Sequence, residues 1–114
     1  MNIQKMMKKM FNRCRITEEN CIDYENAREI LKQKKQAILL DVRSEQEYSE
    51  YHLDGSINIP LYELERKNKR IEGSKQNVII VYCQSGKRSK KAVKFLEQEG
   101  FKNVYELKGG LDEI

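Results

Sequence analysis

Apolar and polar positions follow two different patterns along the chain, one typical of buried strands and the other of amphipathic helices. Short runs that are apolar throughout, or nearly so, predict strands over residues 37–42, 56–59, 77–82 and 103–107. Apolar residues that recur every three or four positions predict helices around residues 24–31, from residue 44, and over residues 61–71 and 87–99. Strands and helices therefore alternate.

Signals at the ends of these runs support the assignment. Ser44 is followed three residues later by Glu47, which is the capping-box pattern that begins a helix. Gly100 stands where a glycine commonly ends a helix. The glycine pair at residues 109–110 predicts a tight turn near the C-terminus.

Apolar strands that alternate with helices are typical of a parallel sheet covered on both faces, so we expect an α/β fold of three layers. In such sheets, ligands bind beyond the carboxyl ends of the strands, where loops lead into helix N-termini. Cys83 directly follows the third predicted strand and shortly precedes a predicted helix. This position makes Cys83 the leading candidate for a functional residue.

The composition is that of an ordinary soluble domain. The 114 residues are 39% apolar and 35% charged, which fits one globular domain. The formal net charge is +4, but residues 1–17 hold five basic residues and no acid, so the remainder is nearly neutral. The charge therefore gives no reason to expect a nucleic-acid partner.

We interpret residues 1–15 as a basic amphipathic N-terminal extension and residues 16–114 as the domain. Apolar residues recur at helical spacing in the extension, with basic residues mostly between them. Such a segment either lies on an anionic membrane or a partner protein, or is a short extension that packs on its own domain. Its shortness favours the second interpretation, because isolated helices below about 12 to 15 residues are marginal in water.

The cysteine and histidine counts narrow the chemistry. Cys14, Cys21 and Cys83 form no close pair, and His52 is the sole histidine, so neither a disulfide framework nor a histidine-rich metal site is expected. A reducing, cytoplasmic setting is the simplest interpretation. The sequence has no apolar run long enough to span a bilayer and no signal-peptide core, so we expect no transmembrane segment.

The loop after the third strand, CQSGKRS at residues 83–89, has the features that activate a thiol. Gly86 allows backbone amides to curl around one point, and a helix N-terminus adds partial positive charge there. Five basic residues and no acid follow within residues 87–94. The alternative is a buried structural cysteine beside a solvated helix face. That alternative suits a cysteine in mid-strand better than one at a strand end, so we expect Cys83 to be a nucleophile. Neither Cys14 nor Cys21 is expected at a strand-to-helix turn.

These residues resemble the signatures of the rhodanese-like sulfurtransferases. Residues 38–60, ILLDVRSEQEYSEYHLDGSINIP, are similar to a D-V-R followed by E-[YF]-x-x-G-H-I-x-G-[AS]-x-N-[IV]-P. Residues 83–89 are similar to the active-site loop C-R-x-G-x-R-S, and residues 107–114, LKGGLDEI, to a closing glycine-pair segment. The resemblance covers about residues 16–114 and implies a small domain with a central parallel five-stranded sheet.

The resemblance also implies an activity. Cys83 would take the outer sulfur of thiosulfate or a persulfide donor, hold it as a persulfide, and pass it to a thiol or cyanide acceptor, without a metal or organic cofactor. The loop would bind the donor, with Lys87 and Arg88 attracting its oxygens. The substrate-binding residues implied are Gln84, Ser85, Gly86, Lys87, Arg88 and Ser89.

Two other functions remain open. A sulfur-relay module would accept persulfide from a protein donor with little thiosulfate activity, and the basic residues would suit an acidic protein partner. Cysteine phosphatases and arsenate reductases use a C-x5-R loop, whereas Cys83 to Arg88 is C-x4-R, one residue tighter, so that function is disfavoured.

Residues near the strand ends are assigned supporting roles. Asp41 and Arg43 either touch the site or serve the structure, in which case Arg43 pairs with Glu47 one helical turn away. His52 is expected to be a hydrogen-bonded loop residue rather than an acid or base. Asn58 and Pro60 are expected to shape the backbone. Tyr51 stands where the family has glycine and Ile114 where it has tryptophan, which bears on packing and acceptor docking.

Overall fold

The computed structural model describes residues 20–66 and 69–114. The expected extension over residues 1–15, with Cys14, lies outside the described residues. The described chain forms a five-stranded sheet in the order β1-β5-β4-β2-β3, and every adjacent pair is parallel. The strands are β1 (Cys21–Ile22), β2 (Ile38–Asp41), β3 (Ser56–Asn58), β4 (Val78–Tyr82) and β5 (Asn103–Leu107).

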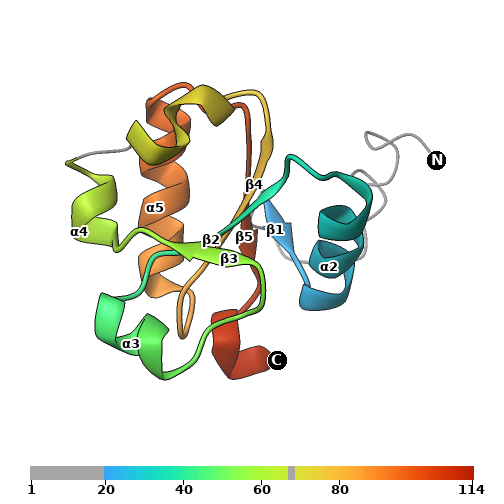
Figure 1. Ribbon diagram of the computed structural model, residues 1–114, viewed down its shortest axis with the longest axis vertical. Helices are drawn as coiled ribbons and strands as arrows, with labels where there is room; N and C mark the ends of the chain where they lie inside the picture. Colours follow the sequence, from blue (N-terminus) through green and yellow to red (C-terminus); the bar gives the residue numbers. More distant parts are fainter. Residues whose placement is uncertain (1–19, 67–68) are drawn as a thin grey trace.

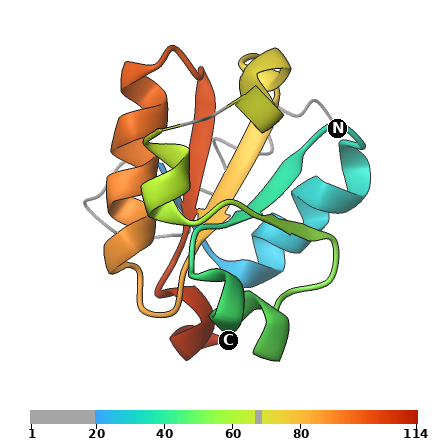
Figure 2. The same cartoon turned by 60° about the vertical axis from the view of Figure 1, so that its left-hand side comes forward.

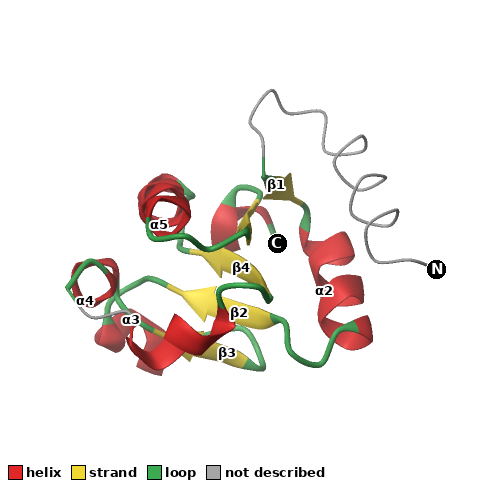
Figure 3. Cartoon of the chain, turned by 90° about the horizontal axis from the view of Figure 1, so that it is seen from above, coloured by secondary structure: helices red, strands yellow, loops and turns green. Residues whose placement is uncertain are grey.

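Helices cover both faces of this sheet, as the alternating pattern predicts (Figures 1 and 3). One face packs against α2, and the other packs against α4 and α5. The helices are α2 (Tyr24–Gln33), α3 (Glu45–Glu50), α4 (Leu61–Leu64) and α5 (Lys87–Gln98), with 3-10 turns η1 (Lys69–Ser74) and η2 (Gly110–Glu113). The three-layer α/β fold is therefore confirmed.

The central strand β4 is buried along its whole length and sends alternate side chains to opposite faces. Ile80 and Tyr82 join the apolar cluster under α2, whereas Ile79 and Val81 join the cluster under α5. Cys83 continues this alternation and also lies in the cluster under α5. The period of two thus places the sulfur on the α5 side of the sheet.

Helix boundaries follow local chemistry closely at two places. Ser44 Oγ accepts a hydrogen bond from the Glu47 amide at 3.1 Å, and the Glu47 carboxylate accepts one from the Ser44 amide at 3.1 Å, which confirms the predicted capping box. Helix α5 ends at Gln98, and Gly100 follows with φ of 96°, which confirms its role as the glycine that ends the helix.

Two expectations from the pattern are wrong. The predicted helix over residues 61–71 stops at Leu64, and a 3-10 turn begins at Lys69. Leu64 and Ile71 are nevertheless both buried, so the apolar positions of the pattern reach the core through two short helical turns instead of one helix.

The parallel five-stranded sheet that the resemblance implies is confirmed, but its fifth strand, β1, is one that the hydrophobic pattern did not show. Two residues are too few for a periodic signal, and β1 is defined by its pairing with Glu106 and Leu107 of β5. Cys21 thus lies in a strand that leads through Asp23 into α2, contrary to the expectation that it is away from any strand-to-helix turn. Over the residues that the structure describes, no helix has the length and apolarity needed to cross a membrane.

Candidate active site

The sulfur of Cys83 lies in a cradle of main-chain donors. Cys83 follows β4 directly and is only 1% exposed. The amide of Gly86 donates to Sγ at 3.0 Å, the amide of Ser89 donates at 3.4 Å, and Ser89 Oγ lies 3.5 Å from Sγ. Hydrogen bonds of this kind favour the anionic form of an acceptor. The loop therefore converges on one sulfur atom, as the sequence predicts.

Gly86 makes the turn that aims these amides. It caps α5 with φ of 103°, a left-handed conformation that residues with a Cβ rarely adopt. The first turn of α5 follows at once, and its Ser89 amide donates to the sulfur at the end of the helix that carries partial positive charge. Strand end, glycine turn and helix N-terminus together form the anion-binding geometry expected at this edge of the sheet.

A buried glutamate that the pattern did not single out lies behind the loop. Ser89 is fully buried, and its Oγ lies 3.0 Å from both the Gly86 carbonyl oxygen and Glu106 Oε2. Glu106 belongs to β5, whose register pairs it with Val81 near the end of β4. The sequence feature that could have pointed to Glu106 was an acidic residue inside a predicted strand.

The C-terminal segment supports the loop from below (Figure 2). The amides of Leu111 and Asp112 donate to the carbonyl oxygens of Cys83 and Gln84, at 3.1 and 2.9 Å. Gln84 Nε2 also donates to Asp112 Oδ1 at 2.7 Å. A Cβ on Gly110 would lie 2.5 Å from the Cys83 carbonyl oxygen, so only glycine fits there. The segment that contains the glycine pair thus positions the backbone of Cys83.

Arg88, expected to attract donor oxygens, has a protein carboxylate as its partner. Its Nη1 and Nη2 donate to the two oxygens of Glu47 at 2.6 and 3.0 Å. The Arg88 guanidinium is the main reason that the pKa of Glu47 falls to about 2. The same hydrogen bonds raise the pKa of Arg88, and charge on Cys83 acts in the same direction. Lys87 is exposed beside this pair.

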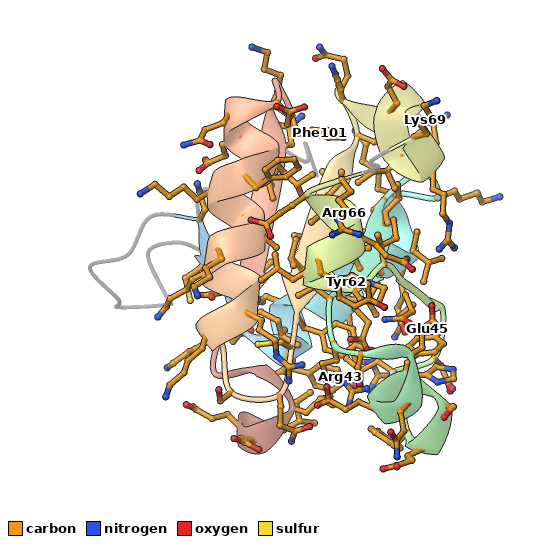
Figure 4. The ribbon with its side chains drawn as sticks, turned by 90° about the vertical axis from the view of Figure 1, so that its left-hand side faces the viewer. Arg43, Glu45, Tyr62, Arg66, Lys69 and Phe101 are labelled. Carbon is orange, nitrogen blue, oxygen red and sulfur yellow. The ribbon has the colours of Figure 1, made fainter. Side chains whose placement is uncertain are left out.

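Arg43 pairs with Asp41, not with Glu47 as one expectation had it. The two side chains are buried and joined by an ion pair of 2.8 Å. Arg43 also donates to the Tyr51 carbonyl oxygen and reaches Gln84 Oε1 at 3.4 Å. Figure 4 shows Arg43 at the end of the molecule where α3 lies. Burial of one hydrogen-bonded pair explains the choice, since Asp41 accepts from the Arg43 side chain through both Oδ1 and Oδ2. The pair links β2 to the loop that follows Cys83.

The remaining predicted residues lie around this core. His52 is exposed, stacks on Tyr48 with ring centroids 3.8 Å apart, and places Nδ1 2.7 Å from the Tyr48 carbonyl oxygen, so it is a hydrogen-bonded loop residue as predicted. Asn58 Nδ2 donates to the carbonyl oxygens of Asp41 and Arg43, which confirms its backbone-shaping role.

The two residues that depart from the family signature are both on the surface. The side chain of Tyr51 is 61% exposed, and that of Ile114 is 53% exposed. The Tyr51 carbonyl oxygen nevertheless accepts from Arg43, so the backbone at this position contributes to the site while the side chain faces outward.

Cys21 lies in a different chemical setting from Cys83. It is buried in β1, and the helix that follows is capped by Asp23, whose carboxylate accepts from the Asn26 amide at 2.8 Å.

Two cavities lie near the carboxyl ends of the strands or the neighbouring helix α2. A cavity of about 570 Å³ opens between α2 and residues 51–54, and Cys83 is not among its lining residues. A second, of about 190 Å³, is lined by Ser85 and Gly86 of the loop together with Lys90 and Glu106. Among the described residues, no group of three or more histidine, cysteine or acidic side chains is placed to hold a metal ion.

Comparison with known proteins gives consistent matches. A family model described as rhodanese-like domain matches residues 23–114. The thiosulfate sulfurtransferase PspE of Escherichia coli is 36% identical over 75 residues, which cover 66% of this chain and 71% of that protein. A solved structure of a rhodanese-related protein from Thermoplasma volcanium has a TM-score of 0.71 at 34% identity, covering 82% of this chain and 88% of the other.

Some relatives are much longer than this chain. The tRNA uridine(34) hydroxylase of Buchnera aphidicola is 36% identical over 83 residues, which cover 69% of this chain and 27% of that protein. The chain therefore spans about a quarter of that relative's length.

Proposed function

The chain belongs to the rhodanese-like domain family, and we propose that it is a sulfurtransferase that carries sulfane sulfur as a persulfide on Cys83. The observation that carries the proposal is the convergence of the Gly86 and Ser89 amides on Cys83 Sγ. Such a cradle stabilises a thiolate before transfer and the terminal anionic sulfur of a persulfide after it.

The reaction is a double displacement without net oxidation. In the first step the Cys83 thiolate attacks the outer sulfur of thiosulfate, a new S–S bond forms, and sulfite leaves with the electron pair of the old S–S bond. In the second step a thiolate or cyanide attacks the outer sulfur of the persulfide, and the Cys83 thiolate leaves. A tight C-x4-R loop whose arginine already holds Glu47 supports this chemistry over phosphoryl transfer.

Each loop residue has a role in this proposal. Gly86 and Ser89 supply the amides that hold the sulfur, while Lys87 and Arg88 attract the anionic donor. Gln84 and Ser85 complete the donor-binding loop. Arg43, held by Asp41, positions Gln84 through its contact with Gln84 Oε1. The domain of residues 16–114 provides all of these groups.

A second candidate is a relay module that takes its sulfur from a protein persulfide. One observation favours it: Arg88 is already paired with a carboxylate and is therefore less free to bind thiosulfate. The basic residues at the start of α5 suit an acidic partner surface.

The proposal is tested by transfer of sulfur from thiosulfate to cyanide, measured as thiocyanate. We expect turnover by the wild-type protein, none by Cys83→Ala, and near wild-type turnover by Cys21→Ala, a matched change at another buried cysteine. If the wild-type protein gives no thiocyanate but is loaded by a protein persulfide, the relay function replaces the enzyme. If Cys83→Ala retains turnover, the assignment of the nucleophile is wrong.

A further inference from the structure

The carboxylate of Glu47 lies among the positive charges of the proposed donor site and is held there by several contacts. Besides Arg88, the amide and hydroxyl of Ser44 each donate to Glu47 Oε1 at 3.1 Å. These contacts belong to the capping box of α3, so the start of the helix fixes where the negative charge sits. Figure 3 shows α3 and α5 on the same side of the sheet, as this pair requires.

Arg88 connects the charge on Glu47 to the sulfur of Cys83. Arg88 lies in the first turn of α5, and its interaction with Cys83 contributes to the raised pKa of the guanidinium. Glu47 also acts on Arg43, which reaches the loop at Gln84. Because Arg88 binds the carboxylate through both terminal nitrogens, an anionic donor must share or displace that partner.

Resting on the proposed function, we propose that Glu47 sets donor specificity: it competes for Arg88 and repels doubly charged donors such as thiosulfate relative to singly charged ones. A dianion experiences twice the repulsion of a monoanion at the same position, because Coulomb energy is proportional to charge. The alternative is that the ion pair only fastens α3 to α5. Both side chains are partly exposed, so the effect on stability is expected to be small.

The test uses two donors of the same shape and different charge, with cyanide as acceptor. Thiosulfate is a dianion, whereas methanethiosulfonate has a methyl group in place of one oxygen and a single negative charge. Both transfer their terminal sulfur to a thiolate, and they release sulfite and methanesulfinate respectively. Steady-state KM and kcat are measured for each donor at constant ionic strength.

We expect Glu47→Gln to lower KM for thiosulfate by roughly three- to tenfold and KM for methanethiosulfonate by about half as much on a logarithmic scale. Glutamine keeps the capping-box pattern, so α3 is expected to stay formed. Glu45→Gln is the matched control, since it removes the same charge from the same helix at an exposed position, and it should leave both values near wild type. Glu47→Asp retains the charge and should keep the wild-type preference between donors.

The inference is overturned if Glu47→Gln changes both donors equally, raises KM for thiosulfate, or matches Glu45→Gln. A fall in the thermal stability of Glu47→Gln with no change in donor preference would show that the Glu47–Arg88 pair is structural. That result would also overturn the inference. Failure of the proposed function looks different, because no donor would then place sulfur on the wild-type protein or on any variant.

Discussion

At the scale of single residues, the site depends on side chains on both faces of β4. Cys83 points toward α5, whereas Tyr82 points toward α2. Tyr82 Oη accepts from the Leu53 amide at 3.1 Å and donates to Ser56 Oγ at 3.0 Å. The residue before the nucleophile therefore ties β4 to the loop over residues 51–55.

The substitution Tyr82→Phe tests these hydrogen bonds. The change leaves the buried Leu53 amide without its acceptor, and we expect a loss of about 1–3 kcal/mol in the free energy of unfolding. Urea denaturation at neutral pH measures it. Tyr62→Phe at an exposed tyrosine is the matched control and should change the free energy little. Equal stability of wild type and Tyr82→Phe would contradict the account.

The same tyrosine predicts a dependence of stability on alkaline pH. Burial is the main cause that raises the pKa of Tyr82 from 10.0 to about 12. A group whose pKa is higher in the folded state contributes stability that is present in full below pH 10 and is lost as the pH rises toward 12. Tyr82→Phe should lack this decline. Parallel stability curves for the two proteins between pH 9 and about 12 would refute the assignment.

At the scale of elements, the loop is held between the end of β4, the start of α5 and the turn η2. Gly110→Ala would push a Cβ against the Cys83 carbonyl oxygen, 2.5 Å away, at a residue with φ of 63°. We expect sulfur transfer to fall by roughly ten- to hundredfold, because small displacements of a reacting group have effects of that size. Gly73→Ala, where a Cβ meets nothing within 4 Å, is the control.

Elements with a strong local signal were predicted from the sequence, and elements defined by distant contacts were not. The capping box at Ser44 and the run ending at Cys83 are local patterns, so α3, β4 and the loop after it could be placed. Strand β1 exists because β5 pairs with it, and Glu106 approaches Ser89 because the register of two strands sets it there. Such pairings depend on the folded sheet, which a linear pattern does not encode.

The hydrogen-bond partners of the charged side chains were harder to predict than the positions of the strands and helices. Glu47 was a plausible partner for Arg43 by helical spacing, yet it binds Arg88, 41 residues away, and Arg43 binds Asp41. The Glu47–Arg88 pair follows from how the ends of β2 and β4 meet at one edge of the sheet, whereas Arg43 and Asp41 lie two residues apart at the end of β2. The sequence thus indicated where the Cys83 loop lies in the fold, but it did not show that Arg88 of this loop already has a partner.

At the scale of the whole molecule, one sheet carries two apolar clusters back to back. Ile79 and Ile80 are adjacent on β4, both fully buried, and lie in different clusters. We expect Ile79→Val and Ile80→Val each to cost about 0.5–1.5 kcal/mol and to shift a single cooperative unfolding transition. Fluorescence and circular dichroism followed during urea denaturation measure it. Separate transitions for the two faces would contradict a shared core.

The central claim, that sulfur is held on Cys83, is tested most directly by peptide mass spectrometry of the wild-type protein after treatment with a sulfane-sulfur donor. The account predicts an added mass of about 32 Da, one sulfur atom, on the peptide that contains Cys83 and on no other cysteine peptide. The added sulfur should leave when cyanide or a thiol is supplied. Finding it on Cys14 or Cys21, or finding an unmodified Cys83 with every donor tried, would contradict the account.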